Sequence, residues 1–206
     1  MTPQTILAVG AHPDDIELGC GGSVAKFAKA GAHVRALVLT HGGVGNRNIA
    51  LHDRVRETRE ALKLLGVEDV YVEEFPDTRL DEHLPELIGC IEKYVTEFTP
   101  DRVYTMFEND RHQDHRAVFH ASNVACRTVR QVLCYETPSC FTNFGPEVFE
   151  DIGDFVDIKV AALKLHESQR DRPYTQPDAM RATATFRGLQ AGISAAEAFI
   201  CHRLIL

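Results

Sequence analysis

Residues 5–15 read Thr-Ile-Leu-Ala-Val-Gly-Ala-His-Pro-Asp-Asp, a short apolar run followed by an imidazole and two carboxylates. A run of apolar and β-branched residues closed by a glycine is typical of a strand that is buried on both faces. A second such run, at 102–106, is followed by His112-Gln113-Asp114-His115. The chain therefore carries two clusters of metal-ligand residue types, each shortly after an expected strand.

Expected strands and helices alternate along the chain up to residue 136. We expect strands at 5–9, 33–39, 70–72, 102–106 and 132–135, and helices at 18–30, 51–65, 82–98 and 114–129. This series predicts an α/β, Rossmann-like fold with a mostly parallel sheet of order about 3-2-1-4-5 and helices on both faces.

The pattern loosens in the C-terminal part. Residues 138–146 and 170–177 are expected to be loops, 157–169 a helix, and the apolar end 195–206 a segment that packs onto the body. We interpret 1–206 as a single domain with a regular core at 1–136 and a looser part at 137–206, whose loops cover the site. The segment from Arg170 to Tyr174 is expected to contribute to that cover.

Size and charge narrow the classes of function. The chain has 206 residues, 44% hydrophobic and 25% charged, as in an ordinary globular domain. Its net charge of -8 argues against nucleic acid or an anionic membrane as the main partner. No apolar run approaches the ~20 residues of a membrane span, and the first residues lack the basic region of a signal peptide. The six cysteines form no CxxC pair, so we expect reduced thiols and a cytoplasmic protein.

The predicted strand order brings the two clusters together. Ligands of open α/β sheets bind beyond the carboxyl ends of the strands where the strand order reverses, here between the first and fourth strands. His12, Asp15 and His115 are the expected metal ligands, because two imidazoles and a carboxylate are a common set for catalytic zinc; ferrous iron is the alternative. Zinc lowers the pKa of bound water to about 7, and Asp14 is then free to act as general base.

The second cluster supplies two further candidates. His112 lies three residues before His115, and it is expected to face the site and, if protonated, to stabilise an oxyanion. Asp114 is expected to hydrogen-bond one of the histidines and so to fix its tautomer. The simpler interpretation of Asp14, Asp15 and Asp114 is that they cap helices, which is compatible with catalysis.

Other motifs are weaker. Residues 19–22 resemble a dinucleotide-binding glycine loop but lack its spacing, so close packing at a helix start is the better interpretation. The glycine-rich loop at 40–46 makes His41 and Asn46 candidates for substrate contact. Arg54 is a third candidate, with a solvated ion pair to Glu57 as the alternative.

The two clusters together resemble the zinc-dependent N-acetylglucosaminyl deacetylases of the PIG-L or LmbE-like superfamily. The resemblance continues through 40–42, 54–57, 75–77, Lys159, 166–169 and 196–199. It implies removal of acetate from an N-acetylamino sugar conjugate. It also places the metal ligands on His12, Asp15 and His115, the base on Asp14, the oxyanion-stabilising residue on His112 supported by Asp114, and a substrate contact on Arg54.

The chain departs from the family pattern at a few positions. Gln113 replaces a usual proline, Ile16 separates the aspartate pair from Glu17, and Asp110 stands where some branches have tyrosine. The family uses many amino sugar conjugates and often assembles as trimers or hexamers, so the resemblance implies a homo-oligomer but no particular substrate. The alternatives are an amidase for a non-sugar N-acyl substrate, and a metal- or sugar-binding protein without turnover. Asp14 beside a full ligand set argues against the second.

Overall fold

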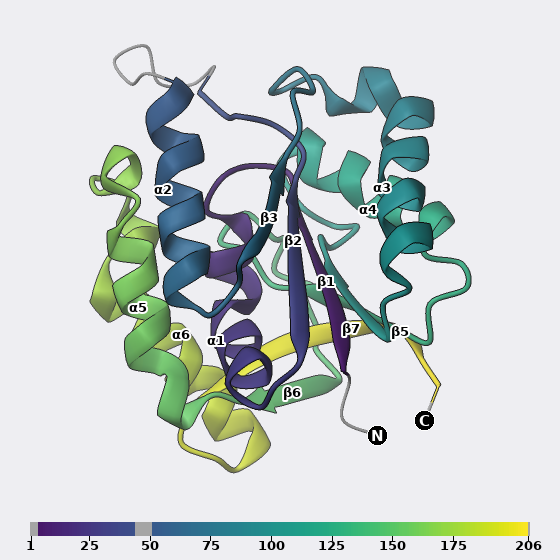
Figure 1. The fold of residues 1–206 in the computed structure, drawn as a ribbon. Coiled ribbons are helices and arrows are strands. Elements are labelled where there is room, and N and C mark those ends of the chain that lie inside the picture. Colours follow the sequence, from purple (N-terminus) through teal and green to yellow (C-terminus); the bar gives the residue numbers. More distant parts are fainter. Residues whose placement is uncertain (1–3, 44–50, 206) are drawn as a thin grey trace.

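A single seven-stranded sheet forms the centre of the structure, a computed structural model that describes residues 4–43 and 51–205. The strand order is β3-β2-β1-β4-β5-β7-β6, which confirms the predicted order 3-2-1-4-5 and extends it by two strands (Figure 1). The first five strands are parallel, whereas β7 is antiparallel to β5 and to β6. The strands are β1 (Thr5–Gly10), β2 (His33–Val38), β3 (Asp69–Val72), β4 (Arg102–Thr105), β5 (Gln131–Tyr135), β6 (Val148–Asp151) and β7 (Ala196–Leu204).

Helices cover both faces of the sheet, as predicted. Figure 1 shows α1, α2, α5 and α6 on one face and α3 and α4 on the other. The α-helices are α1 (Asp15–Lys29), α2 (Leu51–Leu64), α3 (Leu84–Phe98), α4 (Gln113–Ala125), α5 (Val156–Lys164) and α6 (Pro177–Ala191). Short 3-10 turns lie at Leu80–His83, Gly153–Phe155, Glu167–Gln169 and Pro173–Thr175. No helix of the described residues is long and apolar enough to cross a membrane.

The apolar runs form strands because both faces of the central sheet are covered. Every residue of β4 and β5, and all of β1 after Thr5, is buried. A parallel strand of this kind has no solvated face, so it shows a continuous apolar run instead of alternation. The buried side chains of these strands join those of α1, α3 and α4 in one large hydrophobic core.

The C-terminal part is more regular than the sequence indicates. The helix expected at 157–169 ends at Lys164, and the loop expected at 170–177 contains a 3-10 turn. The helix α6 and the strand β6 were not predicted, and the apolar end forms the strand β7. All six cysteines are unpaired, and three of them are buried.

The first helix is broken near its start. Its backbone leaves helical geometry at Cys20, with φ -140° and ψ 18°. Lys159 donates to the carbonyl of Leu18 at 2.7 Å, and the carboxylate of Glu197 accepts from the backbone N–H groups of Gly22 and Ser23 at 2.8 and 2.7 Å. These two side chains therefore satisfy the backbone groups that the break leaves unpaired.

Close packing explains the glycines beside that break. A Cβ at Gly19 would lie 2.0 Å from the ring of Tyr135, and a Cβ at Gly22 would lie 2.9 Å from Ile152. The helix can approach the sheet this closely only where side chains are absent, as the sequence interpretation of residues 19–22 expects.

Candidate metal centre and active site

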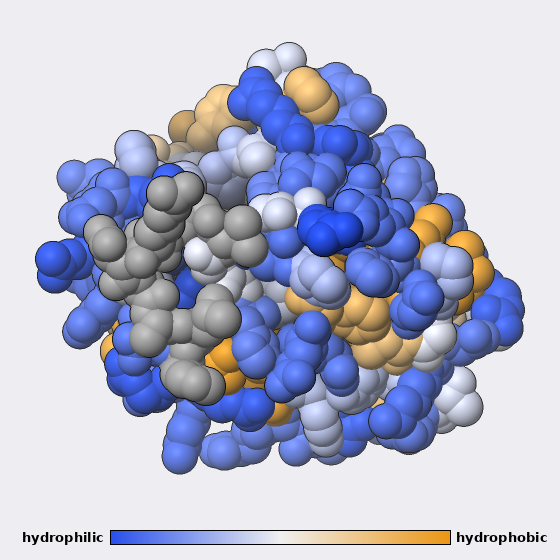
Figure 2. Space-filling model, turned by 90° about the horizontal axis from the view of Figure 1, so that it is seen from above, coloured by the Kyte–Doolittle hydropathy of each residue, from blue (hydrophilic) through white to orange (hydrophobic). Residues whose placement is uncertain are grey.

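The two motif clusters meet at the carboxyl ends of β1 and β4, which are neighbours in the sheet. The helices α1 and α4 begin there, at Asp15 and Gln113. A cavity of about 340 Å³ lies between them, and Figure 2 looks onto this mainly hydrophilic face of the molecule. The cavity is lined by His12, Asp14, Asp15, Leu18, Gly43, Arg54, Asp77, Thr78, His112, His115, Thr137, Pro138, Ser139, Gln169, Arg172 and Tyr174.

His12 is held by carboxylates on both ring nitrogens. Its Nε2 lies 3.0 Å from Oδ2 of Asp114 and 3.1 Å from Oδ1 of Asp77, and its Nδ1 lies 3.4 Å from Oδ2 of Asp15. Burial disfavours the charged imidazole, but these three carboxylates outweigh burial and raise the pKa of His12 well above its usual value. The ring is therefore fixed in orientation and strongly basic.

His115 has the same arrangement with a different carboxylate. Its Nδ1 lies 2.9 Å from Oδ2 of Asp110, and its Nε2 lies 3.4 Å from Oδ1 of Asp15. Burial opposes the charge, yet Asp15 and Asp110 together raise the pKa of His115 to about 9. Asp110 also accepts from the hydroxyl of Thr137 at 2.6 Å and from the backbone N–H of His112 at 2.8 Å. These partners more than offset burial, so the pKa of Asp110 lies below its usual value.

His12, Asp15 and His115 could together hold a divalent cation, because both imidazoles face the carboxylate of Asp15. Two ligand atoms at about 2.0–2.1 Å from a tetrahedral metal lie about 3.3 Å apart, and each imidazole nitrogen that faces Asp15 lies 3.4 Å from one of its oxygens. The other nitrogen of each ring is held by a carboxylate, as in most histidines that bind metals. Bound cations need neutral imidazoles, so binding here would release protons and neutralise the excess of buried carboxylates.

His112 belongs to the same cluster but is held differently. Nitrogens of His12, His112 and His115 lie within 4.8 Å of one another, and the ring of His112 stacks on that of His115 with centroids 4.7 Å apart. Its Nδ1 caps α4 by accepting from the backbone N–H of Asp114 at 3.2 Å. Burial and the two neighbouring imidazoles lower the pKa of His112. The neutral ring then carries its proton on Nε2, which suits a hydrogen-bond donor better than a metal ligand.

Asp14 occupies the N-cap position of α1 without capping it. Its backbone lies in the left-handed region, with φ 107°, and its side chain makes no capping hydrogen bond. For a residue with a Cβ this conformation costs on the order of 1–3 kcal/mol, a cost found mainly at functional sites. The carboxylate is buried beside the cavity, where burial raises the pKa of Asp14 to about 6 against the opposing charge of Arg54.

Arg54 reaches this site from α2. Its Nη2 donates to the carbonyl of Pro13 at 2.7 Å and lies 3.5 Å from Oδ1 of Asp14. Gly42 permits the approach, because a Cβ there would lie 2.1 Å from Nη1 of Arg54 and its φ is 62°. The sequence left open an ion pair between Arg54 and Glu57. In the structure, Glu57 instead accepts hydrogen bonds from the backbone N–H and the hydroxyl of Ser168.

The remaining substrate-binding candidates lie less clearly at the site. His41 is half-buried after β2 and is not among the described residues that line the cavity, although Gly43, two residues later, is. Asn46 lies outside the described residues. Arg172 and Tyr174 line the cavity, so the segment expected to contribute to a cover does border the site.

Three residues of the site escaped the sequence analysis or were placed differently. Asp114 does hydrogen-bond one of the histidines, as the residues predict, but that histidine is His12, whereas only its backbone N–H contacts His112, the residue that the resemblance implies it supports. Asp77 and Asp110 hold the two imidazoles without having been named as site residues. The usable signal was an acidic residue shortly after each of the strands β3 and β4. Asp77 lies in the segment 75–77 of the family resemblance, whereas Asp110 was noted only as a departure from the family pattern.

The sequence is similar to those of known deacetylases. Residues 7–126 match the PIG-L family model, described as GlcNAc-PI de-N-acetylase. The uncharacterized deacetylase YaiS of Escherichia coli K12 is 48% identical over 169 residues, which cover 79% of this chain and 90% of that protein.

Two solved structures share the fold over nearly the whole chain. The conserved protein TT1542 of Thermus thermophilus has a TM-score of 0.87 and 28% identity, covering 98% of this chain and 95% of that one. The N,N'-diacetylchitobiose deacetylase of Pyrococcus horikoshii, solved with an inhibitor, has a TM-score of 0.77 and 25% identity, covering 97% and 84%.

Proposed function

Because this chain belongs to the PIG-L family of deacetylases, we propose that it removes the acetyl group from an N-acetylamino sugar conjugate in a metal-dependent hydrolysis. The observation that carries the proposal is the pair of buried imidazoles that both face Asp15, with Asp14 beside them. The family description names GlcNAc-PI and the Pyrococcus protein is named for diacetylchitobiose, which supports an amino sugar of N-acetylglucosamine type.

His12, Asp15 and His115 would hold the metal, for which zinc suits the donor set and ferrous iron is the alternative. When bound, such a cation supplies Lewis-acid chemistry: it polarises a carbonyl oxygen and acidifies water. Asp114 and Asp110 are positioning residues, since each fixes the orientation of one imidazole.

Asp14 is the general base of the proposed reaction. A carboxylate with a pKa of about 6 is well matched to accepting a proton from water near neutral pH. The same carboxyl group then returns the proton to the leaving nitrogen as the amide C–N bond breaks. A protein that only bound metal or sugar would have no use for a spare carboxylate beside the metal ligands, which argues against a protein without turnover.

His112 and Arg54 act on the substrate. The neutral His112 offers its Nε2–H to the oxygen on which negative charge develops, a contribution of the oxyanion-hole type. Arg54 lies beside Asp14, and its guanidinium, fixed by the carbonyl of Pro13, orients the sugar next to the base. His41 and Asn46 remain predicted substrate contacts on the neighbouring loop. Assembly as a trimer or hexamer also remains a prediction, which the mass of the purified protein in solution would test.

The test is primary-amine release from a panel of N-acetylglucosamine conjugates, using chelated protein with and without added zinc. We expect release only after zinc is added. Asp14→Asn should bind zinc as the native protein does and lose about 10²–10⁴-fold in kcat. Asp154→Asn, at an exposed position that does not line the metal cavity, is the matched control. Full turnover in Asp14→Asn would remove the base assignment, and no amine release from any sugar would remove the substrate class.

A further inference from the structure

The first helix, α1, consists of two pieces that meet at Cys20. The piece before it, residues 14–19, is called the leading turn below; it begins with Asp14 and Asp15, and its Leu18 lines the metal cavity. In an unbroken α-helix the backbone N–H of Gly22 donates to the carbonyl of Leu18, four residues earlier. The non-helical backbone of Cys20 interrupts the helix between these two groups. The rest of α1 therefore does not by itself fix the position of the leading turn.

A buried lysine–glutamate pair is inserted at this interruption. Nζ of Lys159, on α5, donates to the carbonyl of Leu18 at 2.7 Å. Oε1 of Glu197, on β7, accepts from the backbone N–H of Gly22 at 2.8 Å, and its Oε2 accepts from that of Ser23 at 2.7 Å. Nζ of Lys159 also donates to Oε1 of Glu197. The ion pair thus bridges the carbonyl and the N–H that would bond each other in a regular helix.

Stability alone does not require a charged pair at this place. The side chains of Lys159 and Glu197 are only 8% and 4% exposed, so both have lost most of their hydration. Apolar side chains of similar size often stabilise a protein as well as a buried ion pair does, or better. A donor and an acceptor are needed here because α1 is broken, and the break is what sets the direction of the leading turn.

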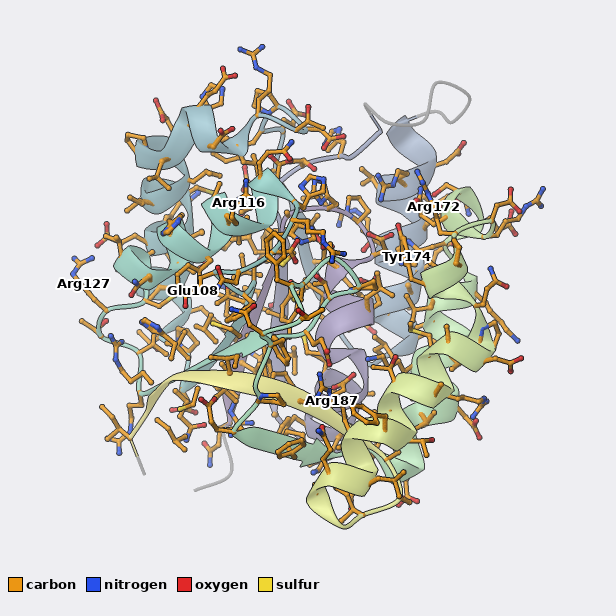
Figure 3. The ribbon with its side chains drawn as sticks, turned by 180° about the vertical axis from the view of Figure 1, so that it is seen from behind. Glu108, Arg116, Arg127, Arg172, Tyr174 and Arg187 are labelled. Atoms are coloured by element: carbon orange, nitrogen blue, oxygen red, sulfur yellow. The ribbon has the colours of Figure 1, made fainter. Side chains whose placement is uncertain are left out.

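Other elements also hold the leading turn. Oε1 of Glu17 accepts from the hydroxyl of Thr58, on α2, at 2.8 Å and lies 2.9 Å from Nε2 of His166, which follows α5. Figure 3 shows α1, in purple, beside the green helix α5, with the yellow strand β7 passing close to it. The leading turn is therefore held by α2, by α5 and the segment after it, and by β7.

The metal centre is sensitive to where this turn lies. The two oxygens of Asp15 lie 3.4 Å from Nδ1 of His12 and 3.4 Å from Nε2 of His115, which belongs to α4 and does not move with α1. A shift of the leading turn changes the distance between Asp15 and His115, and it moves Asp14 in the same step. For reacting groups a misplacement of about 1 Å can cost on the order of 10²-fold in rate.

We propose that Lys159 and Glu197 are positioning residues of the metal centre. Their ion pair keeps α1 open at Cys20 and so holds the leading turn where Asp15 faces both imidazoles and Asp14 lies beside them. Without the pair, the carbonyl of Leu18 and the N–H of Gly22 are left to bond each other, which draws the leading turn toward the axis of a straight helix. The effect on turnover rests on the proposed function, whereas the effect on metal binding does not.

The decisive variant removes both charges at once. Lys159→Met combined with Glu197→Met leaves no unpaired buried charge, so it should fold with a Tm close to that of the native protein. The matched control combines Arg102→Met with Glu150→Met. That change removes another largely buried ion pair, whose Nη1 and Oε1 lie 2.7 Å apart, at the end of β4 away from the metal cavity. Thermal unfolding of the metal-free proteins checks that both variants fold.

Two measurements need no substrate. Zinc affinity is obtained by competition with a chromophoric chelator, and the absorption bands of bound Co²⁺ report how its ligands are arranged. The Lys159/Glu197 variant should bind zinc about 10-fold more weakly or worse and should shift the Co²⁺ bands, as expected when a metal ligand loses its support. The Arg102/Glu150 variant should change neither, although it also loses an ion pair.

Turnover at saturating zinc gives a third comparison. The Lys159/Glu197 variant should keep kcat about 10-fold or more below the native value, because Asp14 moves with the leading turn. KM should change less than kcat, since Arg54 and His112 lie on other elements. A native zinc affinity in the Lys159/Glu197 variant, or an equal loss in the control variant, would overturn the proposal.

A single substitution decides the matter if the double variant does not fold. Lys159→Arg keeps the charge and the donors, but a planar guanidinium cannot reproduce the contacts of an ammonium group. Zinc affinity should then fall in a protein that still folds, and an unchanged affinity would refute the positioning role. If the native protein binds zinc but releases no amine from any sugar, the proposed function fails, while the zinc and Co²⁺ measurements still test this inference.

Discussion

Replacing Asp114 by asparagine tests how the metal centre is held. The side chain is fully buried, and its Oδ2 accepts from Nε2 of His12 at 3.0 Å and from the backbone N–H of Thr78 at 2.7 Å. Its Oδ1 accepts from the backbone N–H of Leu80 at 3.1 Å. An asparagine keeps one acceptor oxygen and turns the other into a donor, so at least one of these groups loses its partner and faces an NH₂ group.

The size of the effect follows from these contacts. One buried N–H without a partner costs about 1–3 kcal/mol. In a protein of this size that is roughly 2–12 °C in Tm for the metal-free protein. Loss of a carboxylate that orients a metal-binding histidine lowers metal affinity about 10–100-fold. At saturating zinc, the proposed general base Asp14 and the proposed oxyanion donor His112 are unchanged, so we expect kcat to recover to within a few-fold.

Zinc affinity is measured by competition with a chromophoric chelator, and stability by thermal unfolding of the metal-free protein. Asp81→Asn is the control, since Asp81 is exposed beside Leu80. An Asp114→Asn protein with native zinc affinity and a large loss of kcat at saturating zinc would refute the argument. That result would favour the sequence-based expectation that Asp114 supports His112.

Three further predictions concern stability. Backbone N–H groups of Gln4 and Thr5 hydrogen-bond Asp101 and lower its pKa, so Asp101→Asn should cost about 1 kcal/mol of unfolding free energy at neutral pH. Folding lowers the pKa of Asp101, so its contribution to the free energy of unfolding is fully present above the unfolded pKa of about 3.9 and is lost as the pH falls through the lower folded pKa. Urea titrations of the native protein and Asp101→Asn at pH 7 and pH 3 should therefore show a smaller difference between the two proteins in acid. Gly89→Ala should raise the free energy of unfolding by about 0.5–1 kcal/mol, because Gly89 lies exposed within α3 and a Cβ there meets nothing within 4 Å. Gly19→Ala should lower it by about 1–3 kcal/mol, since the Cβ meets the ring of Tyr135. A urea midpoint at or below the native value for Gly89→Ala, or at or above it for Gly19→Ala, would contradict the prediction for that variant.

The central strands were predictable because their burial is reflected in their amino-acid composition. Both faces of β1 are covered, so Ile6 to Val9 form a continuous apolar run. The strand β4 is equally buried, and there Val103 and Tyr104 carry the signal between the polar Arg102 and Thr105. From those two strands and the order of a doubly wound sheet, the meeting of His12 with His115 follows.

The helix α6 and the strand β6 were not predictable for the opposite reason. The buried face of α6 consists of Met180, Ala184, Arg187 and Gly188, which are mostly small or charged, whereas its large apolar residues Phe186 and Leu189 are 55% and 72% exposed. The apolar pattern therefore does not mark the buried face. The four-residue strand β6 is only half-buried at the sheet edge and shows too little alternation.

The pairing of carboxylates with histidines also lay beyond the sequence. Asp110 and Asp114 lie within a few residues of both His112 and His115, so spacing alone allows several pairings. The choice depends on how the chain turns between β4 and α4. There His112 takes the N-cap position, and Asp114 turns toward the distant His12.

The left-handed backbone of Asp14 also constrains how this chain can evolve. Glycine adopts such a conformation without steric cost, so selection for stability alone would favour glycine at position 14. If Asp14 is the general base proposed above, selection for hydrolysis retains the carboxylate there. We expect that a homologue that no longer needs the reaction acquires glycine at this position early, before its metal ligands change. That single substitution would identify homologues that keep the fold but have lost the reaction.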